Sequence, residues 1–151
     1  MSMVMVHVWM LSYLALFCFC KKGDGIIKYF NEILLNKDIH MHQMRVAKLA
    51  FELAKKLNLK ESTCQNIYTA ATIHDIGKMY IEPKILKKTS KLTEEEYQTI
   101  KKHVWYSANF AKTKGYSLEV IAFILHHHEN VDGSGYPLGL KGDQISIGGK
   151  V

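Results

Sequence analysis

The chain has 151 residues, enough for one domain with a modest core. Its formal net charge is +6, and nearly all of the positive charge comes from lysines spread along the sequence. Dispersed lysines are typical of a solvated surface, although they also attract anionic ligands. Because no base-stacking motif or zinc-finger spacing accompanies them, the composition argues against binding to a nucleic acid polymer. The three cysteines form no CxxC pair, which favours reduced thiols and a cytoplasmic location for the charged part of the chain.

The amino terminus differs in composition from the remainder, so we divide the chain into a leader (1–22) and a domain (23–151). Residues 1–20 carry no charge, and 3–20 are almost continuously apolar. As a helix they would span about 27 Å, close to the ~30 Å core of a bilayer. Lys21 and Lys22 follow, and the positive-inside rule would place the domain in the cytoplasm. A membrane anchor is therefore expected, with a buried or disordered leader as the alternative.

The rest of the chain predicts helices only. A short amphipathic helix is expected at 26–35, and apolar residues recur at helical spacing from Val46 to Leu57. The next helix is predicted from Ser62 to Ile76, with Gly77 as its stop, followed by a connecting segment over 78–91. No segment alternates with period two, so the predicted fold class is all-α.

Two capping signals define the helices of the second half. Thr93 begins a helix predicted to reach Lys114, and Ser117 caps another that ends in three consecutive histidines. A loop rich in glycine over 130–143 comes next, and a last helix is expected to start at Ile145.

Histidines share the apolar faces of four of these predicted helices. An unpaired buried polar group costs about 1–3 kcal/mol, so each inward imidazole needs a partner. Separate hydrogen bonds would satisfy them one by one, but a shared metal cluster that includes Asp75 is more economical, because bundles build metal sites from facing helices. His126 is predicted to face away from this cluster. The inward histidines are His42, His74, His103, His127 and His128.

Two motifs, His74-Asp75-Ile76-Gly77-Lys78 and His127-His128-Glu129 with Asp132-Gly133-Ser134-Gly135-Tyr136-Pro137, occur in this order with His42 and His103 at matching positions. From about Asp38 to Val151 the chain therefore resembles the HD-GYP domain, a branch of the HD phosphohydrolase superfamily. The resemblance implies a helical bundle of the HD type.

The resemblance also implies a bacterial phosphodiesterase that hydrolyses cyclic di-GMP with two or three divalent ions, iron or manganese. A metal-bound hydroxide would be the nucleophile. Asp75 and Lys78 would be catalytic, with Lys78 on the scissile phosphate. Asp132, Gly133, Gly135, Tyr136 and Pro137 would form a signature loop for substrate and for signalling protein partners. The implied metal ligands are His42, His74, Asp75, His103, His127 and His128.

Two departures from the family pattern leave alternatives open. Ser107 stands where the family usually has glycine. In the family a further aspartate ligand and more helices follow the segment at Ile145, whereas this sequence ends at Val151. We therefore expect a truncated domain with exposed apolar faces that favour oligomers. The alternatives are a degenerate module that binds nucleotide or a signalling partner without hydrolysis, and a general HD-type nucleotide phosphohydrolase.

Overall fold

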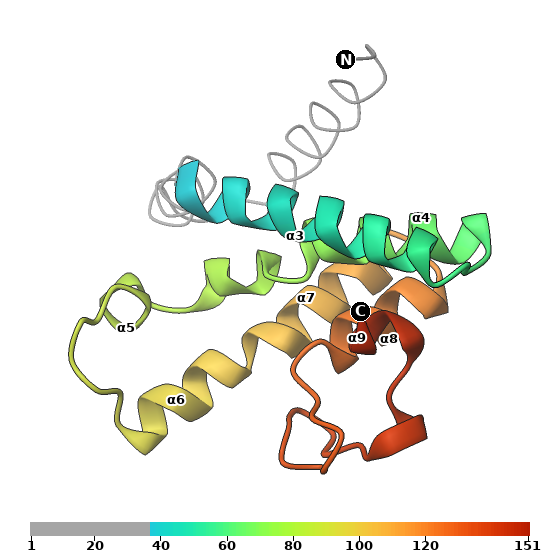
Figure 1. Cartoon of the computed structure of the whole chain (residues 1–151). Coiled ribbons are helices and arrows are strands. Elements are labelled where there is room, and N and C mark those ends of the chain that lie inside the picture. The colour runs from blue at the N-terminus through green and yellow to red at the C-terminus, as the bar shows by residue number, and fades with distance from the viewer. Residues whose placement is uncertain (1–36) are drawn as a thin grey trace. The chain divides into compact units, whose positions relative to one another are not determined.

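The structure is a computed structural model that describes residues 37–151, with side chains from residue 41 onward. Every regular element in this range is helical, and the sole β-type pairing within it is an isolated bridge between Asp132 and Lys141. The all-α prediction is confirmed. The helices are α3 (Lys37–Lys56), α4 (Glu61–Ile73), η1 (Ile76–Tyr80), α5 (Pro83–Leu86), α6 (Glu94–Lys101), α7 (His103–Thr113), α8 (Leu118–His126), η2 (Gly142–Gln144) and α9 (Ile147–Lys150) (Figure 1).

Three predictions fall outside the described residues: the leader 1–22, the apolar segment 3–20 and the helix 26–35. In the part of the chain that the structure does describe, no helix combines the length and apolar character needed to cross a bilayer.

The core lies where α4 and α8 meet, with α3 packed against α4 and α7 against α8. Small side chains from α3 and α7 allow close helix contact, while α8 contributes the larger apolar groups. The buried cluster contains Ala50, Ala54, Cys64, Ile67, Ala70, Ala108, Ala111, Val120, Phe123 and Ile124.

The face of α3 that packs is not the one that hydropathy predicts. The stripe through Val46, Leu49 and Leu53 was expected to point inward, yet Leu49 is 70% exposed. Alanines 47, 50 and 54 face α4 instead, because side chains without bulk let two helix backbones approach closely. The leucines line an open hollow of about 410 Å³ bordered by Phe123 and Val151.

The segment after α4 also differs from its prediction. The α-helix ends at Ile73, and Gly77 lies inside the 3-10 helix η1 rather than acting as a stop. A Cβ atom at Gly77 would lie 2.0 Å from the His103 carbonyl oxygen and 2.8 Å from the Ser107 backbone nitrogen. Glycine is therefore required because η1 packs directly on α7.

The single helix predicted from Thr93 to Lys114 is divided at Lys102 into α6 and α7. Its start is as expected, because Thr93 and Glu96 form a reciprocal capping box. Ser117 likewise caps α8 through the Val120 amide. The expected connecting segment 78–91 contains most of η1 and the short helix α5.

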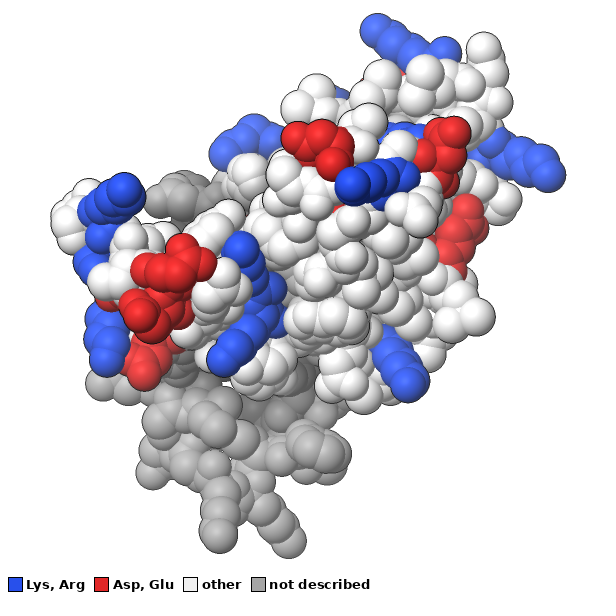
Figure 2. All heavy atoms as spheres, turned by 90° about the horizontal axis from the view of Figure 1, so that it is seen from below, with Lys and Arg blue, Asp and Glu red and all other residues white. Residues whose placement is uncertain are grey.

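Charged side chains are dispersed on the face drawn in Figure 2, where lysines alternate with acidic groups and uncharged areas. Among the described residues several lysines pair with nearby acidic groups, for example Lys55 with Glu61 at 2.8 Å and Lys84 with Glu82 at 2.6 Å. The basic composition therefore does not form one continuous cationic patch on this face.

Candidate metal centre

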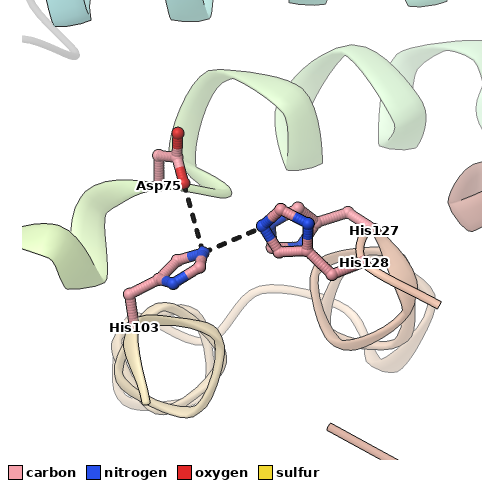
Figure 3. Close-up of side chains that lie close together, drawn as sticks. All are labelled: Asp75, His103, His127 and His128. Atoms are coloured by element: carbon pink, nitrogen blue, oxygen red, sulfur yellow. Dashed lines mark hydrogen bonds and ion pairs between the residues drawn. The ribbon is translucent and has the colours of Figure 1, made fainter. Parts of the chain in front are cut away.

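Three short backbone segments carry the cluster of polar side chains shown in Figure 3. Asp75 lies between α4 and η1, His103 is the first residue of α7, and His127 and His128 follow the last turn of α8. Because these segments pack on one another, residues more than fifty positions apart in sequence point at the same space (Figure 3).

The six side chains that the resemblance assigns as ligands form two groups, and Asp75 belongs to both. The ligand atoms of Asp75, His103, His127 and His128 lie within 4.8 Å of one another, and so do those of His42, His74 and Asp75. A carboxylate has two oxygens and can serve two neighbouring sites. The arrangement is therefore that of two adjacent ligand sets with one shared member.

Backbone hydrogen bonds fix which imidazole nitrogen carries the proton. The Nδ1 atoms of His74, His103 and His127 lie 2.7, 2.7 and 2.6 Å from the carbonyl oxygens of Ala71, Ile100 and Ile124. A carbonyl only accepts, so each Nδ1 donates, and in a neutral ring Nε2 is left with a free lone pair. This is the orientation in which histidines ligate metals.

These lone pairs face other acceptors rather than donors. His103 Nε2 lies 3.4 Å from His127 Nε2 and 3.3 Å from Asp75 Oδ1. Asp75 Oδ1 is itself buried and accepts no well-formed hydrogen bond from the described residues. Two bonds of about 2.1 Å to one cation place ligand atoms about 3–3.5 Å apart, so these spacings fit a shared ion. A cation would relieve the repulsion, and the donor set suits a divalent metal.

The electrostatics keep both ligand types in the required protonation state. Burial, together with the neighbouring imidazole, lowers the pKa of His127 to about 3 and that of His128 to about 4. Burial alone would raise the pKa of Asp75, but the Lys78 ammonium, with Nζ 2.7 Å from Oδ2, holds it well below its usual range. At neutral pH His127 and His128 are therefore neutral imidazoles beside an ionised carboxylate.

Lys78 places a cation at the edge of this cluster. Its Nζ lies 2.7 Å from Asp75 Oδ2, and His74 Nε2 lies 3.2 Å from the same oxygen. The ammonium is therefore paired with the carboxylate that both ligand groups share.

Glu129 holds the following loop against the histidines. Glu129 is only 8% exposed, and its carboxylate accepts hydrogen bonds from the backbone N–H groups of Leu138 at 2.6 Å, Gly139 at 3.2 Å and Leu140 at 2.8 Å. All three of these hydrogen bonds go to the backbone of the signature loop. Three such bonds to a buried charge fix the loop strongly.

The signature loop packs directly on the end of α8. A Cβ atom at Gly135 would lie 2.3 Å from the Asn130 nitrogen, so only glycine permits this approach. The Tyr136 amide then donates to the His128 carbonyl at 3.1 Å, and the Tyr136 ring stacks on the His128 ring at 4.6 Å between centroids. Burial raises the pKa of the Tyr136 phenol to about 12, so it remains a proton donor at neutral pH.

Other loop residues have local roles. Asp132 Oδ1 accepts from the Ser134 amide and hydroxyl, at 2.8 and 2.6 Å, and the Gly133 amide donates to the Asn130 carbonyl. Asp132 and Gly133 thus build a turn, while Pro137 follows Tyr136 at the point where the chain bends back.

His126 lies outside both ligand groups, as its helical phase predicts. Its Nδ1 instead accepts the Ser146 backbone N–H at 3.0 Å. The structure also adds two residues that the sequence did not single out, Tyr97 and Lys101, whose side chains contact Tyr136. One signal for them was present in the sequence: Tyr97 and Lys101 are four residues apart, a spacing that places both side chains on the same face of a helix.

A helical bundle that directs histidines and an aspartate of an HD motif into one cluster defines the HD class of domains. The family model described as "HD domain" matches residues 28–151. This chain belongs to the HD domain family, and its motifs place it in the HD-GYP branch.

The relatives are longer proteins. A cyclic di-GMP phosphodiesterase of Pseudomonas aeruginosa is 38% identical over 72% of this chain and 26% of its own length, and one of Borreliella burgdorferi is 37% identical over 80% and 32%. A 3′3′-cGAMP-specific phosphodiesterase of Vibrio cholerae is 36% identical over 73% and 26%. The chain thus spans about a quarter to a third of these relatives. Among solved structures, an HDG"Y"P protein of Bdellovibrio bacteriovorus superposes with a TM-score of 0.63 and 25% identity over 83% of this chain and 46% of that one.

Proposed function

We propose that this chain binds two or three divalent metal ions and hydrolyses cyclic di-GMP. The observation that carries the proposal is the pair of ligand groups that share Asp75. They are lined by Nε2 lone pairs of His74, His103 and His127 for which residues 37–151 provide no hydrogen-bond donor. Mixed imidazole and carboxylate ligation suits iron, manganese or zinc, and the family resemblance favours iron or manganese.

Each proposed role follows from position. His103, His127 and His128 would hold one ion with Asp75, and His42 and His74 would hold a second with the same carboxylate. When bound, such ions supply a Lewis acid for the phosphodiester and lower the pKa of a water molecule. Lys78, at the edge of the cluster, would neutralise charge that develops on the phosphate oxygens.

The signature loop would form one wall of the substrate site. Tyr136 faces the cluster through His128, so its phenol would donate a hydrogen bond to the bound nucleotide. Asp132, Gly133, Gly135 and Pro137 would shape this wall and present it to protein partners.

A second substrate has support of its own. Relatives named as 3′3′-cGAMP-specific phosphodiesterases match at 36% identity, close to the 38% of the first cyclic di-GMP phosphodiesterase. The two substrates share the same cyclic backbone and differ in one base. The metal chemistry proposed here would serve either, so the base contacts must decide between them.

The test is hydrolysis of cyclic di-GMP and 3′3′-cGAMP by the purified full chain loaded with Mn²⁺ or Fe²⁺, followed by chromatography of the products. Asp75→Asn keeps the size of the side chain and removes its charge, so it should abolish turnover with the circular dichroism spectrum kept. Asp143→Asn is the matched control, because this exposed carboxylate contacts only Lys150 among the described residues. Equal turnover by parent and Asp75→Asn would refute the metal mechanism.

Other results would select an alternative. Nucleotide binding without turnover would support a degenerate binding module, and hydrolysis of nucleoside phosphates but not of cyclic dinucleotides would support a general HD phosphohydrolase. Four expectations drawn from the sequence stay predictions: the boundary between residues 22 and 23, the membrane anchor at 3–20, the cytoplasmic location and an oligomeric state.

A further inference from the structure

A corner of two tyrosine rings and one ammonium group lies beside the candidate metal centre. The Tyr97 and Tyr136 rings meet at an interplanar angle of 80°, with 6.3 Å between centroids. Lys101 Nζ lies 4.5 Å from the Tyr97 centroid and 5.3 Å from that of Tyr136. Tyr97 and Lys101 are one turn apart on α6, whereas Tyr136 comes from the signature loop.

This corner continues a series of rings that begins at the proposed ligands. His103 and His128 lie 5.2 Å apart, His128 and Tyr136 lie 4.6 Å apart, and Tyr97 follows at the outer end. A phosphate held at the histidines would therefore have its own nucleoside extending along these rings. Tyr97 is 41% exposed, so its ring remains accessible to a planar group.

Lys101 has no competing partner. It pairs with no carboxylate among the described residues, and the aromatic rings are the groups that hold it. A phosphate-binding site usually gathers several cations or backbone N–H groups, whereas one cation between ring faces is suited to a base.

We propose that Tyr97, Lys101 and Tyr136 form a subsite for a guanine base, a role that rests on the proposed cyclic-dinucleotide function. The base would stack on Tyr97, and Lys101 would donate to its O6 and N7. Guanine offers acceptors at both positions, whereas adenine has an amino donor in place of O6. Since an ammonium group only donates, it favours guanine and opposes adenine.

The substrate preference follows from this chemistry. Cyclic di-GMP and 3′3′-cGAMP each contain a guanine that would fill the subsite, whereas cyclic di-AMP contains none. The corner therefore selects for substrates with at least one guanine and does not distinguish the two named for the relatives.

The test compares the binding of GMP and AMP to the Mn²⁺-loaded full chain by equilibrium dialysis. Both carry the same phosphate and sugar, so their affinity ratio reports the base. GMP should bind about tenfold more tightly to the parent, and the ratio should fall to about one in Lys101→Met and in Tyr97→Leu. Lys102→Met removes an exposed neighbouring charge outside the corner and should keep the parent ratio.

Two results would overturn the subsite: equal binding of GMP and AMP by the parent, or an unchanged ratio in Lys101→Met. An unchanged ratio with an equal loss of affinity for both nucleotides would identify Lys101 as a phosphate contact instead. Hydrolysis of bis(p-nitrophenyl) phosphate, a diester without a base, separates the two proposals. If the metal-loaded chain does not hydrolyse this diester, the result counts against the metal chemistry alone. The GMP to AMP affinity ratio shows separately whether the guanine subsite exists.

Discussion

The Glu129→Gln substitution tests how the signature loop is held against the histidines. The carboxylate accepts three backbone N–H groups, from Leu138, Gly139 and Leu140, at 2.6, 3.2 and 2.8 Å. Glutamine has the same shape, but it replaces one acceptor oxygen with an amino group. That group would face an amide that also donates, so at least one contact becomes repulsive.

The expected loss can be worked from these contacts. A hydrogen bond to a charged group contributes about 1.5–3 kcal/mol, and a buried donor left unbonded costs about 1–3 kcal/mol. Oε2 accepts from Leu140, while Oε1 accepts from both Leu138 and Gly139. If the glutamine oxygen stays bonded to the Leu138 and Gly139 amides, the free energy that holds the loop in place falls by about 2–4 kcal/mol. This figure combines one lost hydrogen bond with the weakening of two others.

Hydrogen exchange measured by mass spectrometry is the appropriate assay, because it reports the three amides themselves. In Glu129→Gln their exchange should accelerate by one to three orders of magnitude, about 1.4 kcal/mol for each factor of ten, while the amides of α4 and α7 keep their protection. Glu94→Gln is the control, since the only hydrogen bond of that exposed carboxylate within residues 37–151 is with the Gln98 side chain. Unchanged exchange of the peptide that contains Leu138–Leu140 would refute this account of the loop.

Three further predictions concern the packing and titration of the cluster. Gly77→Ala should destabilise the fold by about 3 kcal/mol or more in chemical denaturation, because a Cβ atom meets the His103 carbonyl oxygen at 2.0 Å; a loss below about 1 kcal/mol would contradict this contact. Ser107→Ala should cost about 1–3 kcal/mol, since the Ser107 hydroxyl accepts the buried Gly77 N–H at 2.8 Å, and an equally stable variant would show that this bond contributes nothing. The metal-free protein should be less stable at pH 5 than at pH 7. Its His127 has a pKa of about 3, against 6.5 ordinarily. Below about pH 6.5 the unfolded chain therefore binds a proton at this residue, whereas the folded chain does not bind it until about pH 3. This residue alone lowers the free energy of unfolding by about 2 kcal/mol at pH 5. Denaturation midpoints that do not change between the two pH values would contradict the lowered pKa.

Helical periodicity placed His74, His103, His127 and His128 at buried or partly buried positions, because a constant spacing decides which side chains share a helix face. It was wrong for His42, which is exposed on the leucine stripe of α3. His127 and His128 were separated from His126 on this basis, and the structure gives His126 a different neighbour, Ser146. The capping box at Thr93 was also predictable, because its two hydrogen bonds involve residues only three positions apart.

The prediction of the buried face of α3 from hydropathy was wrong, because close approach of the helix backbones mattered more than the amount of apolar area. The leucines of α3 outweigh its alanines on any hydrophobic scale, yet Ala47, Ala50 and Ala54 face α4 and Leu49 lies open. The prediction that Gly77 ends a helix failed for a related reason. A sequence does not reveal which glycine a neighbouring backbone will contact.

The contacts around the signature loop could not be predicted from local sequence. Glu129 reaches amides nine to eleven residues ahead, and Tyr97 meets Tyr136 from a different helix. Both depend on the loop conformation, which no periodic pattern encodes.

The most direct test of the central claim is the metal content of the purified chain and three variants, measured by inductively coupled plasma mass spectrometry after loading with Mn²⁺. Asp75 belongs to both ligand groups, His42 to one and His128 to the other. The parent should therefore hold at least two ions per chain, His42→Gln and His128→Gln should each lose one, and Asp75→Asn should hold close to none. Full metal content in Asp75→Asn, or the same loss in all three variants, would contradict two sites joined by a shared carboxylate.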